Sequence, residues 1–202
     1  MSGRRIYLVR HGETASNAAR VFQLPETPLS ERGLEQAEQL AARLAGRGIA
    51  LVLASDYARA ALTAERLAAA TAAPLELEPL LQERNFGALR GRPYAELDED
   101  AFARGFEPPG GESWPAFEAR VDRAWERVLA VSARCAGSLA VVTHGLVCFS
   151  LASRHLRLPA GADPRRGFPN TSLTVIEPEP PFAVSLLACA AHLEPGGGSG
   201  AV

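Results

Sequence analysis

Two stretches of the sequence each place a histidine between a strand-like apolar run and a glycine. They are Ile6–Val9 followed by Arg10-His11-Gly12, and Leu139–Val142 followed by Thr143-His144-Gly145. A third apolar run, residues 51–54, precedes Ser55 and Asp56, with Arg59 one helical turn later, and Glu83 follows an extended segment. Ligands gather at the carboxyl ends of the strands in open α/β sheets. If these runs are neighbouring strands, two histidines, two arginines and a glutamate meet in one crevice.

This set of side chains suits phosphoryl transfer. Guanidinium groups offer forked donors to phosphoryl oxygens, and a neutral imidazole can attack phosphorus, with nearby positive charge lowering its pKa. A carboxylic acid at the rim can protonate the departing alkoxide and later deprotonate water. We therefore expect His11 to attack a phosphoryl group held by Arg10, and Gly12 to let the backbone approach the ligand closely.

Each of these residues has an ordinary structural explanation when it is taken alone. A histidine after a strand is usually a satisfied structural group, Arg59 suits a solvated helix and Glu83 a surface carboxylate. Two histidines and a glutamate could also bind zinc. The zinc hypothesis fits less well because Arg10 and Arg59 would repel the cation. The joint pattern at several strand ends favours one catalytic site.

The elements that must position these residues alternate between strands and helices. Buried strands are expected at residues 5–9, 51–54 and 139–142, an edge strand and a turn at 74–81, and two more strands at 171–176 and 182–190. Helices are expected from Ser30 to about Gly48, from Tyr57 to about Thr71 and from Gly145 to about Leu156, with a short helix between Tyr94 and Arg104. Ser113 is expected to cap a further amphipathic helix whose apolar face includes Phe117 and Val131. This order predicts a three-layer α/β/α sandwich with a mostly parallel central sheet and helices on both faces.

Composition limits the function classes further. The 202 residues suit one domain, expected over 1–194, with a flexible glycine-rich tail at 195–202. A net charge of -2 gives no case for nucleic acid or an anionic membrane, and no apolar run has the length of a membrane span. With no signal-peptide pattern and three widely spaced cysteines, a cytoplasmic protein is expected. A homodimer remains open.

Beyond the heptad Leu8-Val9-Arg10-His11-Gly12-Glu13-Thr14, an ordered set of motifs resembles the histidine phosphatase superfamily, the phosphoglycerate mutase-like proteins. The further motifs are Thr27-Pro28-Leu29-Ser30, Ser55 with Arg59-Ala60, Leu81-Gln82-Glu83 with Phe86-Gly87, Gly110-Gly111-Glu112-Ser113, Val142-Thr143-His144-Gly145 and Asn170-Thr171-Ser172. The resemblance covers residues 5–176 in the family's order.

The resemblance implies roles position by position. His11 is then the phosphorylated nucleophile and Glu83 the proton donor and acceptor, while Arg10, Arg59 and His144 bind the phosphoryl group with help from Asn17. Gly12, Thr143, Gly145 and Arg84 are expected as further substrate-binding residues. Neither a metal nor an organic cofactor is expected.

One departure separates two activities within the family. Glu83 and Glu112 are only 29 positions apart, whereas the resemblance to true cofactor-dependent mutases would require a longer insertion there. A shorter cover should admit water, so a phosphomonoesterase acting on a small phosphorylated metabolite is preferred over a mutase. A phosphate-binding regulatory module without turnover is the third hypothesis.

Residues 84–112 are expected to form a lid that sets substrate choice. Arg84, Arg90, Arg92 and Arg104 lie there among Phe86, Tyr94, Phe102 and Phe106. The mixture fits either a substrate with additional acidic groups or surface arginines over a local apolar cluster, and the sequence does not choose between them.

Overall fold

The computed structural model describes residues 3–194, so the tail predicted at 195–202 lies outside the described residues. A six-stranded sheet has the order β3-β2-β4-β1-β5-β6. The strands are β1 (Ile6–Arg10), β2 (Ile49–Ala54), β3 (Leu75–Leu77), β4 (Ser138–Thr143), β5 (Leu173–Ile176) and β6 (Val184–Cys189). The first four are mutually parallel, and β5 runs antiparallel to both β1 and β6. The predicted mostly parallel sheet is confirmed.

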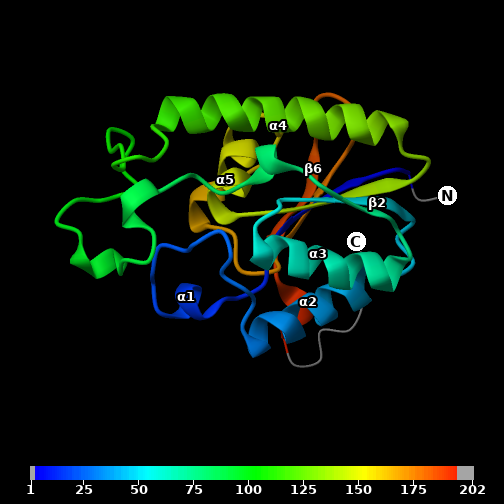
Figure 1. Ribbon diagram of the computed structural model, residues 1–202. Helices are drawn as coiled ribbons and strands as arrows, with labels where there is room; N and C mark the ends of the chain where they lie inside the picture. Colours follow the sequence, from blue (N-terminus) through cyan, green and yellow to red (C-terminus); the bar gives the residue numbers. More distant parts are fainter. Residues whose placement is uncertain (1–2, 195–202) are drawn as a thin grey trace.

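Helices cover both faces of the sheet, as the sandwich prediction requires (Figure 1). One face carries α2 (Glu31–Leu44) and α3 (Ala58–Thr71), and the other carries α4 (Trp114–Arg134) and α5 (Gly145–Arg154). Alternate residues of a strand point to opposite faces. In β1, Tyr7 and Val9 accordingly pack against α2 and α3, while Ile6 and Leu8 pack beneath α4 and α5.

The sheet register brings the reactive segments to one edge. Arg10 at the end of β1 pairs with Thr143 at the end of β4, and Ala54 of β2 pairs with Val142. The antiparallel strand β5 begins at this edge, since Val9 pairs with Leu173. One edge of the sheet therefore carries the carboxyl ends of β1, β2 and β4 together with the start of β5.

Residues 84–112, here called the insertion segment, extend away from the sheet between the short 3-10 helix Pro79–Leu81 and α4 (Figure 1). The short helix predicted between Tyr94 and Arg104 was wrong: only the 3-10 turn Tyr94–Glu96 forms. In a helix over this stretch Glu96 and Asp100 would lie four positions apart on one face, where like charges repel. Residues 12–29, which follow β1, contain the one-turn helix α1 (Ala15–Ala18).

The two ends of the insertion segment meet in a narrow neck, formed by residues 85–88 and 109–112. Ala88 donates to the carbonyl of Pro109 at 2.9 Å, and Glu112 donates to the carbonyl of Asn85 at 2.8 Å. Gly87 has a positive φ of 51°, and a Cβ there would lie 2.1 Å from the carbonyl oxygen of Pro109. Only glycine allows the two backbones to approach this closely.

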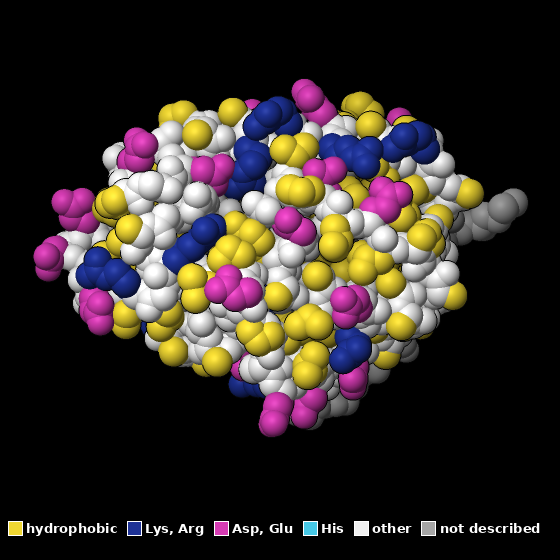
Figure 2. All heavy atoms as spheres, viewed as in Figure 1, with side chains coloured by type: hydrophobic (Ala, Val, Ile, Leu, Met, Phe, Trp, Pro, Cys, Tyr) yellow, Lys and Arg dark blue, Asp and Glu magenta, His cyan; other side chains and the backbone are white. Residues whose placement is uncertain are grey.

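The outer surface is chemically mixed. On the face shown in Figure 2, basic and acidic side chains are interspersed among apolar ones. None of the helices within residues 3–194 combines the length and the apolar composition that crossing a bilayer requires.

Candidate active site

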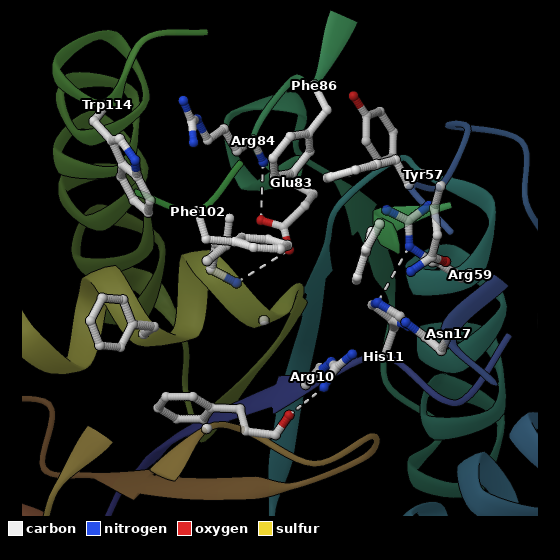
Figure 3. Close-up of a pocket in the computed structure, with 18 of the residues that line it drawn as sticks. Arg10, His11, Asn17, Tyr57, Arg59, Glu83, Arg84, Phe86, Phe102 and Trp114 are labelled. Atoms are coloured by element: carbon white, nitrogen blue, oxygen red, sulfur yellow. Dashed lines mark hydrogen bonds between the residues drawn. The ribbon is translucent and has the colours of Figure 1, made fainter. Parts of the chain in front are cut away.

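A cavity of about 750 Å³ opens at the edge where the strands end. Its lining includes Arg10, His11, Asn17, Arg59 and Glu83, and aromatic side chains from the insertion segment and from α5. In Figure 3, His11, Arg59 and Asn17 lie on one side of the cavity and Glu83 lies opposite them. The structure thus brings together residues as far apart in the sequence as Arg10 and Phe168.

His11 follows β1 and is 2 % exposed. Its Nδ1 lies 2.7 Å from the carbonyl oxygen of Gly12, so Nδ1 holds the proton and donates it. Nε2 is then unprotonated, and it accepts a hydrogen bond from Nε of Arg59 at 3.3 Å. Burial lowers the pKa of His11 well below its ordinary value, and the charges of Arg59 and Arg10 lower it further. The ring therefore presents an unprotonated nitrogen beside two cations, with its lone pair bonded to Arg59.

Two guanidinium groups flank that nitrogen. Nη1 of Arg10 donates to the carbonyl of Phe168 at 2.5 Å, while its Nε is buried without a partner among the described residues. Arg59 lies in the first turn of α3, and its Nη1 donates to the carbonyl of Leu24 at 3.0 Å. Burial lowers the pKa of Arg59 to about 10, so it remains charged at neutral pH. Both side chains are fixed by carbonyls and retain donors for an anion.

His144 is fully buried, with its ring centroid 5.2 Å from that of His11. Ser55 Oγ accepts from the backbone N–H of Tyr57 at 3.3 Å and lies 2.8 Å from Nε2 of His144. When the Ser55 hydroxyl donates its proton to Nε2, Nδ1 is the protonated nitrogen of the ring. Nδ1 is buried without a partner within residues 3–194. Like Nε of Arg10, it is a donor that a phosphoryl oxygen would satisfy.

Glu83 stands in the cavity wall with both carboxylate oxygens bonded to backbone N–H groups. Oε1 accepts from Arg84 at 3.0 Å, and Oε2 accepts from Leu146 at 3.2 Å. Desolvation raises the pKa of Glu83 above its ordinary value, although the two backbone hydrogen bonds and Arg59 oppose the shift. A carboxyl group with a raised pKa is suited to give and take protons near neutral pH.

The remaining predicted substrate residues fall into two groups. Asn17 and Gly145 line the cavity, and Gly145 begins α5. Thr143 is fully buried and donates its hydroxyl to the carbonyl of Leu81 at 2.7 Å, so it holds the segment before Glu83. Gly12 lies outside the cavity lining, and a Cβ there would lie 2.5 Å from the carbonyl oxygen of Gly33 in α2. The close approach at Gly12 is to this helix.

The close contact between the His11 loop and α2 predicts that a substitution at Gly33, on the helix side of the contact, destabilises the protein. A Cβ at Gly33 would lie 2.0 Å from the carbonyl oxygen of Glu13, so Gly33→Ala must push α2 away from the His11 loop. We expect a loss of about 1–3 kcal/mol in the free energy of unfolding, measured by urea denaturation. Gly105→Ala is the matched control because a Cβ there meets nothing within 4 Å. Equal stabilities of the two variants would contradict the prediction.

Arg84 lines the cavity, but its guanidinium is already bonded to the insertion segment. It donates to the carbonyls of Glu112 at 3.0 Å, Ala101 at 3.2 Å and Phe106 at 2.7 Å, and it stacks 4.6 Å from the Trp114 ring. Arg84 is 1 % exposed. We therefore assign Arg84 the role of anchoring the insertion segment. This replaces the substrate contact that was expected from the sequence.

Within residues 3–194, no three His, Cys, Asp or Glu side chains cluster in a way that could hold a metal ion. The cavity offers imidazole, guanidinium, amide, carboxyl and phenol groups, together with phenyl rings.

Several residues of this site were missed from the sequence. Ser55 sets the protonated nitrogen of His144, and Thr63 accepts from Gly12 N–H while donating to the carbonyl of Arg59. Ser55 lies in the quoted motif with Arg59, and Thr63 follows Arg59 by four residues, so their spacing to Arg59 was an available signal. The carbonyl of Phe168 holds Arg10, and no sequence pattern could have identified a backbone contact 158 positions away.

Comparisons with known proteins agree with this geometry. The family model of the histidine phosphatase superfamily (branch 1) matches residues 6–187. The probable phosphoglycerate mutase GpmB of Yersinia pestis (strain Pestoides F) is 35 % identical over 183 residues, covering 86 % of this chain and 84 % of the relative.

Solved structures extend the comparison. A putative alpha-ribazole-5'-P phosphatase from Escherichia coli has a TM-score of 0.80 at 30 % identity, covering 94 % of this chain and 98 % of that one. A mycobacterial glucosyl-3-phosphoglycerate phosphatase, in a complex with VO3, has a TM-score of 0.73 at 28 % identity, covering 87 % and 91 %. With the family model spanning most of its length, the chain belongs to the histidine phosphatase superfamily.

Proposed function

We propose that this protein is a phosphomonoesterase that hydrolyses a small phosphorylated metabolite through a phosphohistidine at His11. The observation that carries the proposal is the unprotonated Nε2 of His11, which faces the cavity beside Arg59 and opposite Glu83. Phosphoryl transfer mainly requires positioning and neutralisation of the phosphoryl oxygens, and this arrangement can supply both.

In the first step, Nε2 of His11 forms a bond to phosphorus as the ester P–O bond breaks. Arg10, Arg59 and Nδ1 of His144 donate to the phosphoryl oxygens, with Asn17 at the rim of the cavity. The leaving alkoxide takes the proton of the Glu83 carboxyl group. The Nδ1–H bond to the Gly12 carbonyl holds the His11 ring in place while its other nitrogen carries the phosphoryl group.

In the second step, the Glu83 carboxylate takes a proton from a water molecule that attacks phosphorus. The P–N bond breaks, inorganic phosphate leaves, and both His11 and Glu83 return to their starting protonation states. A raised pKa for Glu83 suits both directions of proton transfer, because the group is then near half protonation at a higher pH than an exposed glutamate.

Hydrolysis is favoured over a mutase reaction by the insertion segment. It is short, and its four arginines are already bonded: Arg84 to carbonyl groups, Arg90 to the Tyr57 hydroxyl, Arg92 to Glu96 and Arg104 to Glu118. A phosphoglycerate that must be retained and turned over needs cations for its carboxylate. We propose that the domain spans residues 1–194 and that the insertion segment covers the substrate without excluding water.

The test compares two products from one substrate. Purified protein is incubated with 3-phosphoglycerate and, separately, with p-nitrophenyl phosphate, in excess EDTA. We expect inorganic phosphate from both esters without formation of 2-phosphoglycerate, and a protein-bound phosphoryl label that is lost in acid and stable in base. Isomer formation without phosphate release would favour the mutase, and a label that survives acid would exclude a phosphohistidine.

A further inference from the structure

The part of the cavity beyond the phosphoryl end is aromatic. Phe86 and Phe102 of the insertion segment, Phe149 of α5 and Phe168 all contribute to its lining. Phe102 is 38 % exposed, and its ring centroid lies 5.6 Å from that of Phe86. In Figure 3, Phe102 projects into the cavity beside Glu83, where the leaving alcohol must lie.

The cations in the same region have partners within the protein. Arg104 forms an ion pair with Glu118 and stacks 4.5 Å from the Trp114 ring, and Arg165 is bonded to Asp163. Nη2 of Arg90 donates to the Tyr57 hydroxyl at 2.8 Å. A second anionic group on the substrate would have to compete with these bonds, whereas an aromatic ring would bury apolar surface against the phenyl groups.

We propose that this region binds an aromatic ring of the leaving alcohol, so the preferred substrates are phosphomonoesters of ring-bearing alcohols without a second anionic group. The proposal rests on the phosphomonoesterase function. It resolves the two interpretations of the insertion arginines in favour of arginines packed over an apolar cluster.

Benzyl phosphate and ethyl phosphate test the proposal, because their alcohols have similar basicity and differ mainly in the ring. We expect kcat/KM, measured as phosphate release, to be about 10- to 100-fold higher for benzyl phosphate. It should also exceed the value for 3-phosphoglycerate. Phe102→Ala should reduce the benzyl-to-ethyl ratio by about tenfold. Leu77→Ala, at an exposed apolar residue of β3 outside the cavity, is the matched control and should leave the ratio unchanged.

The outcomes separate this inference from the proposed function. Phosphate release with a benzyl-to-ethyl ratio near one, or with 3-phosphoglycerate as the best substrate, overturns the ring subsite and leaves the phosphomonoesterase intact. Release from none of the esters removes the phosphomonoesterase, and the subsite with it. If Phe102→Ala disturbs folding, Phe102→Leu serves as the second variant. It keeps an apolar side chain at the position and should keep part of the preference for benzyl phosphate.

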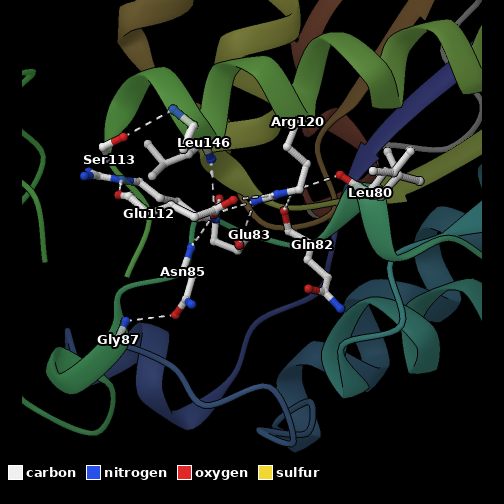
Figure 4. Close-up of polar contacts among 12 residues, drawn as sticks. Leu80, Gln82, Glu83, Asn85, Gly87, Glu112, Ser113, Arg120 and Leu146 are labelled. Carbon is white, nitrogen blue, oxygen red and sulfur yellow. Dashed lines mark hydrogen bonds and ion pairs between the residues drawn. The ribbon is translucent and has the colours of Figure 1, made fainter. Parts of the chain in front are cut away.

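A separate observation concerns the backbone that carries Glu83. Arg120 of α4 donates from Nη1 to the carbonyls of Leu80 at 2.9 Å and Gln82 at 2.7 Å, and from Nη2 to that of Glu83 at 3.2 Å. The same guanidinium forms a two-point ion pair with Glu112, at 2.8 and 2.7 Å (Figure 4). Oε2 of Glu112 also accepts from the backbone N–H of Asn85 at 2.8 Å. The pair thus fixes the chain on both sides of Glu83.

We infer that Arg120 is a positioning residue for Glu83. Neither Arg120 nor Glu112 lines the cavity, and their side chains are only 13 % and 20 % exposed, while both bond directly to the segment that carries Glu83. The planar guanidinium satisfies five acceptors at once, and lysine, with three donors on one nitrogen, cannot reproduce that geometry. This inference depends on Glu83 acting as the acid and base.

A leaving-group comparison tests the inference. We expect Arg120→Met to lower kcat/KM for benzyl phosphate, which reports phosphoryl transfer to His11, by about 10- to 100-fold. The fall in kcat/KM should be smaller for p-nitrophenyl phosphate, whose leaving group needs no proton. In a Glu83→Gln background, Arg120→Met should add no further loss for benzyl phosphate. Arg123→Met, an exposed arginine on the same helix, is the matched control.

A purely structural role gives a different pattern. Equal losses with both esters, or losses that add in the double variant, would overturn the inference. Glu112→Gln keeps an acceptor toward Arg120 but loses the charge, and it should show a weaker form of the same leaving-group dependence. That variant, together with unfolding temperatures for each protein, keeps the inference testable if Arg120→Met folds poorly.

Discussion

His11→Ala is expected to reduce phosphate release by about 10⁴- to 10⁶-fold and to remove the protein-bound phosphoryl label entirely. The alanine variant retains Arg10, Arg59 and His144, so it should still bind phosphate or vanadate. What it lacks is the nitrogen that forms the P–N bond. The measurement is phosphate release from p-nitrophenyl phosphate, together with acid-quenched labelling from a radioactive phosphomonoester.

His155→Gln is the control for a histidine that stands apart from the cavity, bonded to Asp122 at 2.8 Å. It should keep wild-type turnover. A label on the His11→Ala protein would contradict the assignment of the nucleophile. Both variants need thermal unfolding curves, since His11 is buried and its replacement leaves a small void.

The same histidine predicts the acid side of the pH profile. Burial and the charges of Arg59 and Arg10 lower the pKa of His11 well below that of an exposed histidine. Nε2 therefore stays unprotonated at pH values where an exposed imidazole is half protonated, and turnover should persist there.

Glu83→Gln is expected to lower turnover of benzyl phosphate by about 10²- to 10⁴-fold, because glutamine cannot protonate the alkoxide. With p-nitrophenyl phosphate the first step needs no proton donor, so the phosphoenzyme should form quickly. Its hydrolysis should then be slow, because no base activates the attacking water. Rapid mixing should show a burst of p-nitrophenol, with the phosphoryl label accumulating on His11.

The pH dependence of this variant gives a second check. The first step in the wild-type protein requires a protonated Glu83, so the rate with benzyl phosphate should fall as the pH rises through the raised pKa of that group. Glu83→Gln should lose this basic limb. Glu78→Gln is the matched control, because the Glu78 carboxylate accepts from Leu80 N–H and pairs with Arg127 outside the cavity. A basic limb that survives in Glu83→Gln would assign the proton donor elsewhere.

The sheet and its helices were largely predictable because their local signals agree with the tertiary structure. Continuous apolar runs mark β1, β2 and β4, which are buried on both faces, and Ser30 and Ser113 cap α2 and α4 through their side chains. The insertion segment was less predictable. Its conformation depends on Arg84 binding three distant carbonyls and on a local aromatic cluster, and neither has a periodic pattern.

The site shows the same division. Strand ends and motif order indicated His11, Arg59, Glu83 and His144, which the structure places around one cavity or directly behind it. The contacts that orient them are mostly to backbone groups, as at Gly12, Phe168 and Leu146. Any residue type supplies a backbone carbonyl or N–H group. Contacts to such groups therefore do not depend on the residue type and cannot be predicted from the sequence.

The closed neck at Gly87 and Gly111 has an evolutionary consequence. Because the chain leaves and returns at nearly the same point, the stretch from residue 88 to 108 can change in length or composition without moving the strands that hold the phosphoryl chemistry. Loop closure depends only weakly on length, so the thermodynamic penalty of a replacement is small. Grafting this stretch from a relative of different specificity should therefore transfer the preference while leaving the reaction in place.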